Sequence, residues 1–389
     1  MTGDPEHPYC RMIALRVVLD GVSAEPATGV GLHALELTRG LIETAPRGCE
    51  VRGFTPSLPD SEYDIIAERL PGLSTLDKSA LDRRQLAAAW QHGFSRLPGS
   101  GPMHAPSLLA PLYRHDRVDD PNEQIIVTIH DTAAWSHPEV LTSRGVAWHR
   151  AMARRAHKYA DAVVVPSHSV ADELADILSF GDRIRVIPGA VGRAFRVPDD
   201  ADAVARRLSL PSTFIALTGT VDRRSGLSSI IDALSLPDAP DLPLVVFTDS
   251  GSGSALDAAI ADSPARRNRL LVLDGLEAHE RAVVLDRALL AIAPLLADSF
   301  VIAALEAMTL ATPLVHTDQP ALRETVGDAG LLVESDSVAD LAEGLAARLS
   351  ELASDTEART VLGLAGQDRA RAFTWRDAAE KTWQLHADL

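Results

Sequence analysis

Short runs rich in Val, Ile and Leu recur along this chain and alternate with stretches of helical periodicity. The runs are mostly apolar at successive positions, whereas a strand with one face in water would alternate apolar and polar residues. Continuous apolar strands joined by helical crossovers are typical of parallel sheets that helices cover on both faces. We therefore predict an α/β fold built from doubly wound parallel sheets.

Nine runs are predicted as strands, at residues 13–20, 124–131, 162–167, 183–189, 214–220, 242–249, 269–275, 289–294 and 312–318. Helical patterns between them span residues 32–44, 144–159, 168–178, 227–236, 277–287, 302–309 and 338–349.

The length of 389 residues exceeds that of one ordinary hydrophobic core, which predicts two domains. The polar, proline-flanked segment 192–212 interrupts the pattern after the fourth predicted strand. We place the domain boundary near its start, with one domain over 1–195 and the next from 196. Two such sheets make two Rossmann-like domains, and ligands are expected at the carboxyl ends of the strands, in a cleft between the domains.

The net charge is −17, of which −4 falls on the residues up to Phe195 and −13 on those from Arg196 onward. A chain this acidic is a poor general binder of nucleic acid, so a phosphate ligand would need a few local arginines and backbone amides. The two cysteines form neither a disulfide framework nor a metal cluster and suit a reducing cytosol.

Two segments bear on location. Residues 1–11 carry no apolar signal-peptide core, and we expect them to be dispensable for folding. The apolar run 289–308 is interrupted by Pro294 and by charged residues, so we interpret it as a strand, a loop and a helix. These features predict a cytoplasmic protein.

The predicted helix 144–159 carries Arg150, Arg154 and Lys158 at four-residue spacing, with Arg155 adjacent. Such a face suits anionic headgroups at the inner side of a membrane, which predicts peripheral membrane contact. A solvated basic helix is the alternative interpretation.

The segment TGVGLHALEL, residues 28–37, follows the first predicted strand. Gly29 and Gly31 permit a tight turn, after which the amides of a helix start can face an anion. An ordinary strand-to-helix turn has the same pattern. The dinucleotide-binding fingerprint is incomplete, because a third glycine and a well-placed ribose acid are missing.

His130 and Asp131 follow the second predicted strand in the segment IHDTAAWSHP. An imidazole beside a carboxylate can bind hydroxyls and move protons near neutral pH. A strand-end histidine bonded to nearby backbone is the alternative.

In the second half, Arg223 and Arg224 lie between a strand that ends at Thr220 and a helix, which is a suitable place for a pyrophosphate. Two solvated loop arginines would look the same.

The segment ADSFVIAALEAM, residues 297–308, carries Asp298 in a predicted loop and Glu306 about one turn inside the next helix. Carboxylates there suit the hydroxyls of sugars and ribose, while amides at the helix start suit phosphates. The alternatives are a helix cap for Asp298 and a surface position for Glu306.

Taken in order, these segments resemble the retaining, nucleotide-sugar-dependent glycosyltransferases of family 4, which have the GT-B fold. The resemblance runs from Val17 to about Trp383 and includes VVVPSHSVADEL, IRVIPGAV and TPLVHTDQPALRETVGDAGLLV. It implies domains over residues 1–195 and 196–372, and a C-terminal helix at 373–389 that crosses back to the first domain.

The resemblance also implies roles for single residues. Glu306 would hold the ribose of the donor, Asp298 the donor sugar, and His130 would lie near the sugar and the acceptor. Arg224 matches the family's phosphate-binding arginine. The implied catalytic residues are His130, Asp131, Asp298 and Arg224. The implied donor-binding residues are Gly29, Gly31, Thr220, Arg223, Arg224, Ser299, Phe300, Val301, Ile302 and Glu306.

Three departures from the family pattern stand out. The family's phosphate-binding lysine falls on Ser225, its first glutamate is Asp298, and the loop GFGLP is here SFVIA. We expect a glycosyltransferase that uses a nucleoside-diphosphate sugar, such as a UDP- or GDP-sugar, as co-substrate, with a glycan or lipid-linked acceptor and no cofactor or metal. A GT-B protein that has lost catalysis and serves as a binding partner or scaffold is the alternative.

Overall fold

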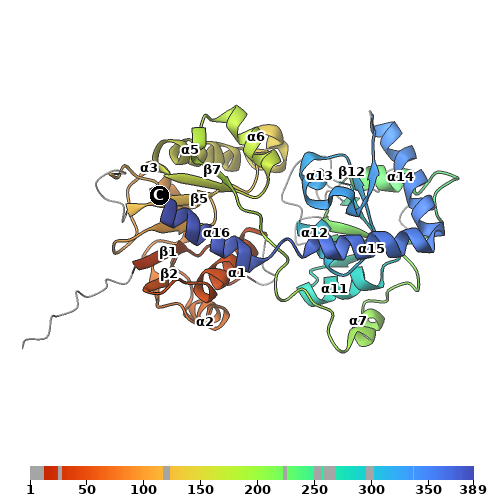
Figure 1. Cartoon of the computed structure of the whole chain (residues 1–389), viewed down its shortest axis with the longest axis horizontal. Helices are drawn as coiled ribbons and strands as arrows, with labels where there is room; N and C mark the ends of the chain where they lie inside the picture. The colour runs from red at the N-terminus through yellow and green to blue at the C-terminus, as the bar shows by residue number, and fades with distance from the viewer. Residues whose placement is uncertain are drawn as a thin grey trace, which may run out of the picture. The chain divides into compact units, whose positions relative to one another are not determined.

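Figure 1 presents a computed structural model of the chain. The structure describes residues 13–24, 29–116, 123–221, 226–248, 256–257, 269–294, 302–335 and 337–389. The chain divides into two compact units, each with one parallel sheet. The first unit takes in the residues up to Pro166, Ala171–Pro188 and Trp375–Leu389, and the second takes in Ser167–Val170 and Gly189–Thr374.

The sheet of the first unit has the strand order β3-β2-β1-β4-β5-β6-β7. Its strands are β1 (Ile13–Val18), β2 (Cys49–Thr55), β3 (Thr75–Lys78), β4 (Met103–Ala105), β5 (Ile125–Thr128), β6 (Ala162–Val165) and β7 (Ile184–Val186). Its helices are α1 (Gly29–Glu43), α2 (Asp60–Arg69), α3 (Arg83–His92), α4 (Ala133–Ser136), α5 (Ser143–Tyr159), α6 (His168–Ile177) and α16 (Trp375–Asp388).

The sheet of the second unit has the order β10-β9-β8-β11-β12-β13. Its strands are β8 (Ile215–Thr220), β9 (Leu244–Thr248), β10 (Leu270–Asp274), β11 (Leu290–Ala293), β12 (Leu314–Thr317) and β13 (Leu331–Val333). Its helices are α7 (Ala201–Arg207), α8 (Leu227–Ala233), α11 (Ala278–Arg287), α12 (Ile302–Thr309), α13 (Pro320–Val326), α14 (Val338–Ser354) and α15 (Thr356–Ala370).

Both sheets are doubly wound, as the apolar runs predict. The strand order reverses between β1 and β4 in the first unit and between β8 and β11 in the second. Helices that follow the strands on either side of such a reversal leave a crevice beyond the carboxyl ends of the strands, where α/β proteins bind ligands. The strand order thus predicts that each unit binds its ligand at the carboxyl edge of its sheet.

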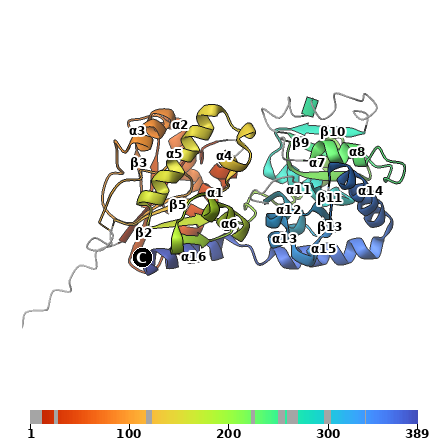
Figure 2. The same ribbon diagram turned by 90° about the horizontal axis from the view of Figure 1, so that it is seen from above.

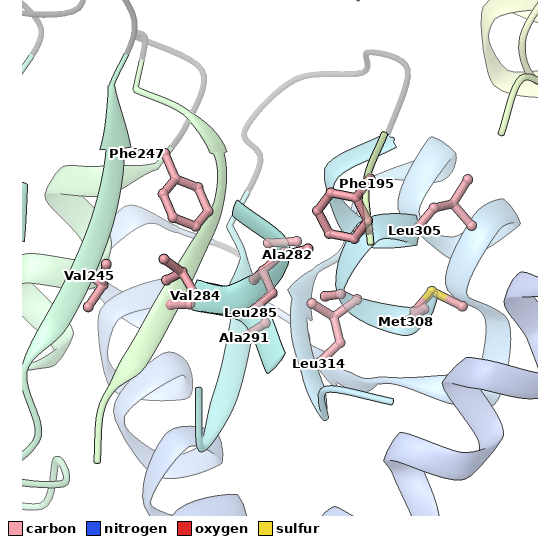
Figure 3. Packing of buried hydrophobic residues seen from close by; sticks show 14 of the residues in the cluster. Phe195, Val245, Phe247, Ala282, Val284, Leu285, Ala291, Leu305, Met308 and Leu314 are labelled. Atoms are coloured by element: carbon pink, nitrogen blue, oxygen red, sulfur yellow. The ribbon is translucent and has the colours of Figure 1, made fainter. Parts of the chain in front are cut away.

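The core of the second unit explains why its central strands carry apolar residues at successive positions. Ile215 and Leu217 of β8 pack in the cluster that contains α8 and α14, whereas Ala216 packs in the cluster that contains α11 and α12. Successive strand residues point to opposite faces, so both faces need apolar side chains when helices cover both. Figure 3 shows the second of these clusters, in which Phe247, Leu285 and other labelled residues pack together.

Four strands were not predicted from the sequence. Strand β2 carries Glu50 and Arg52 at partly exposed positions, and β3 is an edge strand whose residues are all partly or fully exposed. Strands β4 and β13 contain three residues each, too few for a periodic signal. Each of the nine predicted runs does contain a strand, with ends that differ by a few residues.

The predicted break at 192–212 is part of the second unit. Phe195, where the predicted first domain ends, packs in the core with Phe214. Helix α7 lies inside the predicted break and buries Ala201 and Val204 against Val283 of α11. The compact second unit accordingly starts at Gly189 rather than at residue 196, apart from the four residues Ser167–Val170.

The C-terminal helix α16 packs on α1 in the first unit, as Figures 1 and 2 show. Gly40 permits this close approach, because a Cβ there would lie 2.8 Å from the carbonyl oxygen of Trp375. The indole Nε1 of Trp383 donates a hydrogen bond of 3.1 Å to the carbonyl oxygen of Leu41. The last helix of the chain is therefore built into the unit that contains the first strand.

Candidate active site

The two glycines of the segment TGVGLHALEL lie inside the first turn of α1, since this helix begins at Gly29. The prediction that they form a turn before the helix is therefore wrong. Gly31 is buried, and a Cβ there would collide with the carbonyl oxygen of Gly21 in the loop after β1. Gly29 is exposed and has no such neighbour within 4 Å. Of these two glycines, only Gly31 is therefore required for the close packing of α1 on this loop.

An ion pair and a hydrogen bond also hold this loop. The buried carboxylate of Asp20 accepts two hydrogen bonds from Arg83, at 2.7 and 2.8 Å. This pairing raises the pKa of Arg83. The hydroxyl of Ser23 donates to Glu62 at 2.5 Å. Four polar residues that the sequence analysis did not single out therefore fix the loop at the carboxyl end of β1.

His130 follows β5 at the same edge of the sheet. Its Nε2 lies 2.8 Å from the carbonyl oxygen of Pro106. A carbonyl oxygen only accepts, so Nε2 carries the proton and the lone pair of the neutral ring is on Nδ1. Burial lowers the pKa of His130, and the hydrogen bond to Pro106 and the charge of Asp131 offset part of this effect. His130 is thus a neutral ring whose Nδ1 can accept a hydrogen bond.

The carboxylate of Asp131 accepts a hydrogen bond of 2.9 Å from the backbone amide of Ala133, the first residue of α4. One of its oxygens is therefore used in ordering the chain after β5. This contact has a structural role. A direct catalytic role for Asp131 stays a prediction.

A second histidine lies against His130. The ring of His33, from α1, meets that of His130 edge-on with 4.7 Å between centroids, and it meets Trp375 of α16 at 5.2 Å. His33 is buried, and neither of its ring nitrogens has a hydrogen-bond partner among the described residues. Burial and the neighbouring His130 and His104 lower its pKa well below the ordinary value. A neutral His33 adds no positive charge beside His130.

His33 could not be found from sequence periodicity, because α1 is buried on almost all sides. Nearly every residue from Gly31 to Leu41 is buried, so one polar residue does not mark a distinct face. Only the packing of α16 on α1 brings His33 to Trp375.

In the second unit, two glycines with positive φ flank the segment that carries the predicted phosphate-binding arginines. Gly219, in β8, has φ of 79°, and Gly226, before α8, has φ of 62°. A Cβ on Gly226 would also collide with the carbonyl oxygen of Pro294, directly after β11. Residues 222–225, with Arg223, Arg224 and Ser225, lie outside the described residues, and for Thr220 only the backbone is described.

Glu306 lies in the second turn of α12 and is 5% exposed. Its Oε1 accepts a hydrogen bond of 2.9 Å from Nη2 of Arg281, in α11. Burial raises the pKa of Glu306, and the charge and hydrogen bond of Arg281 act in the opposite direction. The alternative that Glu306 is a surface residue is therefore wrong.

Of the other residues in this predicted donor site, Ile302 begins α12 and is partly buried. Asp298, Ser299, Phe300 and Val301 lie outside the described residues.

Arg281 is a further residue of this site that the sequence analysis missed. It lies in the first turn of α11, which follows β10, and α12 follows β11. Both side chains therefore lie near the carboxyl edge of the second sheet. In the sequence, Arg281 is spaced to pair with Glu277 on its own helix, and only the packing of α11 on α12 reveals its pairing with Glu306.

Two of the four basic residues of α5 that were predicted to face a membrane donate hydrogen bonds to backbone carbonyl oxygens. Arg150 donates from Nε to the carbonyl oxygen of Ala134 at 2.9 Å, and Arg155 donates to the carbonyl oxygen of Leu112. Arg154 and Lys158 are exposed. Among the residues that the structure describes, no helix has both the length and the apolar character needed to cross a bilayer.

Comparison with known proteins agrees with this arrangement of two units. The model of Glycosyltransferase Family 4 matches residues 27–194, and that of Glycosyl transferases group 1 matches residues 212–351. Each model falls mainly on one of the two sheets.

Two curated relatives are similar in sequence. Alpha-maltose-1-phosphate synthase of Mycolicibacterium smegmatis is 27% identical over 60% of this chain, which spans 64% of that protein. MMP alpha-(1->4)-mannosyltransferase of Mycolicibacterium hassiacum is 25% identical over 91% of this chain and 93% of its own length.

Solved structures share the fold. Sucrose-phosphate synthase of Thermosynechococcus elongatus matches with a TM-score of 0.72 at 19% identity, over 97% of this chain and 98% of that one. Anabaena HepE, solved in complex with UDP-glucose, matches with a TM-score of 0.69 at 14% identity, over 97% and 100%. Two family models together span both sheets, and the structural neighbours have the GT-B fold. The chain therefore belongs to the glycosyltransferases of family 4, group 1.

Proposed function

We propose that the protein is a retaining glycosyltransferase that moves a sugar from a nucleoside-diphosphate sugar to a hydroxyl group of a glycan, polyol or glycolipid acceptor. In this reaction the bond between the anomeric carbon and the diphosphate oxygen breaks, and the acceptor oxygen forms the new bond. The acceptor proton leaves with the diphosphate. Family membership and the names of the relatives support glycosyl transfer.

The observation that carries the proposal is the buried carboxylate of Glu306 near the carboxyl edge of the second sheet. A carboxylate in this place suits a neutral polyol, because its oxygens accept hydrogen bonds from hydroxyl groups. We assign it to the ribose of the donor. The glycine-bounded segment between β8 and α8, with Arg223 and Arg224, is assigned to the diphosphate.

His130 is assigned to the donor sugar. Its Nδ1 can accept a hydrogen bond from a sugar hydroxyl, and its Nε2 is already bound to Pro106. A neutral imidazole suits this task, because it keeps an acceptor at Nδ1, whereas an imidazolium ring only donates.

A thermal-shift screen with nucleoside diphosphates and their sugars tests the proposal. A ligand at 100 times its dissociation constant stabilises the folded state by about 2.7 kcal/mol. The best donor is then incubated with simple sugars and inositol phosphates, and NMR of the product gives its anomeric configuration. A product with inverted configuration contradicts the retaining mechanism, and a lack of any stabilisation contradicts nucleotide-sugar binding altogether.

The second candidate is a GT-B protein without catalysis that acts as a binding partner. Ser225 in place of the family's lysine and the loop SFVIA favour it. This candidate predicts that the protein binds the donor without turnover, or that it neither binds nor turns over the donor.

We also propose that the enzyme needs no metal, because arginines and helix amides would stabilise the leaving diphosphate. If EDTA stops turnover and added Mg²⁺ restores it, the proposal that no metal is needed is contradicted.

A further inference from the structure

The ion pair between Arg281 and Glu306 joins two helices that both start at the carboxyl edge of the second sheet. Nη2 of Arg281 lies 2.9 Å from Oε1 of Glu306, and Nη1 donates to the carbonyl oxygen of Leu276, just before α11, at 3.4 Å. The guanidinium is therefore held at both of its terminal nitrogens, Nη1 and Nη2. A guanidinium fixed in this way fixes the carboxylate that it binds.

The surroundings of Glu306 make this contact important for its charge. The carboxyl group is buried, and burial disfavours the ionised form. Arg281 is the charged residue that acts against this effect. Only an ionised carboxylate is an acceptor at both oxygens, whereas a protonated carboxyl group donates at one of them.

We propose that Arg281 is a positioning residue for nucleotide binding: it orients Glu306 through one carboxylate oxygen, so that the other oxygen accepts hydrogen bonds from the ribose hydroxyls. This inference rests on the proposed donor site and adds to it a residue outside the segment ADSFVIAALEAM. Arg281 itself does not touch the nucleotide. Its effect is on the ribose and not on the base or the phosphates.

The test compares ribonucleotides with analogues that lack the ribose hydroxyls. Dissociation constants of UDP and GDP, and of their 2′,3′-dideoxy analogues, are measured by calorimetry for the wild type, Arg281→Met and Arg281→Lys. The wild type should bind the better ribonucleotide about tenfold or more tightly than its dideoxy analogue, as expected for a hydrogen bond to a charged group. Arg281→Met should lose most of this preference, and Arg281→Lys should recover part of it.

Two further variants separate positioning from general damage. In a Glu306→Gln background, Arg281→Met should cause no additional loss of ribose preference, because the two residues act through one contact. Arg207→Met is the matched control, since Arg207 pairs with Glu280, the neighbour of Arg281 in α11, at 2.6 Å. This control should leave the ribose preference of the wild type unchanged.

The pH dependence gives a second measurement. Without Arg281, the burial of Glu306 acts alone and its pKa should rise, so that the carboxyl group is partly protonated toward acidic pH. The ribose preference of Arg281→Met should therefore decrease more than that of the wild type as the pH is lowered.

The outcomes distinguish this inference from the proposed function. If the wild type binds UDP or GDP with a ribose preference and Arg281→Met retains that preference, the proposed role of Arg281 is wrong. The proposed donor site is not contradicted by this outcome. A wild type that binds none of the nucleoside diphosphates in the thermal-shift screen overturns both this inference and the proposed function. Equal loss of affinity for ribonucleotide and dideoxy analogue in Arg281→Met contradicts a role through the ribose.

Discussion

At the scale of single residues, the neutral state of His130 is decided by the atoms around it. Its Nε2 donates a hydrogen bond to the carbonyl oxygen of Pro106, and burial lowers the pKa of the ring. The ring of His33 packs edge-on against it. Replacement by phenylalanine keeps a ring of similar shape against His33 but removes the Nδ1 lone pair.

We expect His130→Phe to weaken binding of the nucleotide sugar by about 1 kcal/mol, roughly fivefold, because one hydrogen bond to the sugar is lost. Affinity for the free nucleoside diphosphate should not change, since it lacks the donor sugar to which His130 is assigned. Calorimetry with both ligands measures the difference. An equal loss for both ligands contradicts the assignment of His130 to the sugar.

A second prediction at this scale concerns the missing lysine at Ser225. If Arg223 supplies the charge for the leaving diphosphate, Arg223→Ala should lower kcat on the order of 100-fold, as for the loss of a preorganised charge-stabilising group. Ser225→Lys should then add little. Steady-state kinetics of both variants with the best donor decide the matter: a silent Arg223→Ala together with an activating Ser225→Lys means that the site has lost its charge.

At the scale of elements, the two glycines of α1 have different surroundings although they are two residues apart. A Cβ at Gly31 would collide with the carbonyl oxygen of Gly21, whereas a Cβ at Gly29 would meet nothing within 4 Å. The difference lies in the packing of α1 on the loop after β1, and not in the helix itself.

We therefore expect Gly31→Ala to reduce the free energy of unfolding of the first unit by about 1–3 kcal/mol, as for an overpacked contact with backbone. Gly29→Ala should be neutral or slightly stabilising, because alanine favours a helix over glycine. Urea unfolding followed by tryptophan fluorescence measures both, since all five tryptophans belong to the first unit. Equal effects at the two positions contradict the packing argument.

At the scale of the whole molecule, both units bury titratable groups whose pKa values burial shifts. The first unit buries His33, His104 and His386, whose pKa values burial lowers, to about 3 for His104. The second buries His316, whose pKa burial also lowers, and Glu306, whose pKa burial raises. The stability of the first unit should thus decrease in acid, whereas in the second unit the two groups act in opposite directions.

A histidine with a lowered folded pKa stays neutral while the unfolded chain takes up a proton, so its contribution to stability falls as pH decreases below about 6.5. For His104 this amounts to about 2 kcal/mol between pH 7 and pH 5, at about 1.36 kcal/mol per pH unit. Glu306 has the opposite sign: its unfolded form loses the proton first, so its contribution falls as pH rises above about 4.5.

Urea unfolding at pH 7 and pH 5, followed by tryptophan fluorescence, measures the effect in the first unit. The free energy of unfolding should decrease markedly at pH 5, and His104→Met should remove about 2 kcal/mol of that decrease. His92→Gln is the control, because His92 is exposed on α3. A pH dependence that His104→Met leaves unchanged contradicts the neutral buried state of His104.

Much of the fold follows from the sequence for a local reason. A strand that helices cover on both faces is apolar at most positions, and nine runs that are mostly apolar are present between helical patterns. The same local rule fails for β2 and β3, where exposed charged residues and an edge position remove the signal, and for the three-residue strands β4 and β13. The position of His130 after a strand also follows from the sequence, because residues that leave a parallel strand lie at its carboxyl edge.

Contacts between distant segments were decided by the tertiary structure alone. The pairing of Arg281 with Glu306 depends on the packing of two helices that both start at the carboxyl edge of one sheet. The contact of His33 with Trp375 depends on the packing of α16 on α1. No local pattern encodes them, because each joins residues whose separation in the chain is unrelated to any helical or strand period. The sequence thus determined which residues lie at the sheet edges, and the packing of helices decided the partners and charge states of Glu306 and His130.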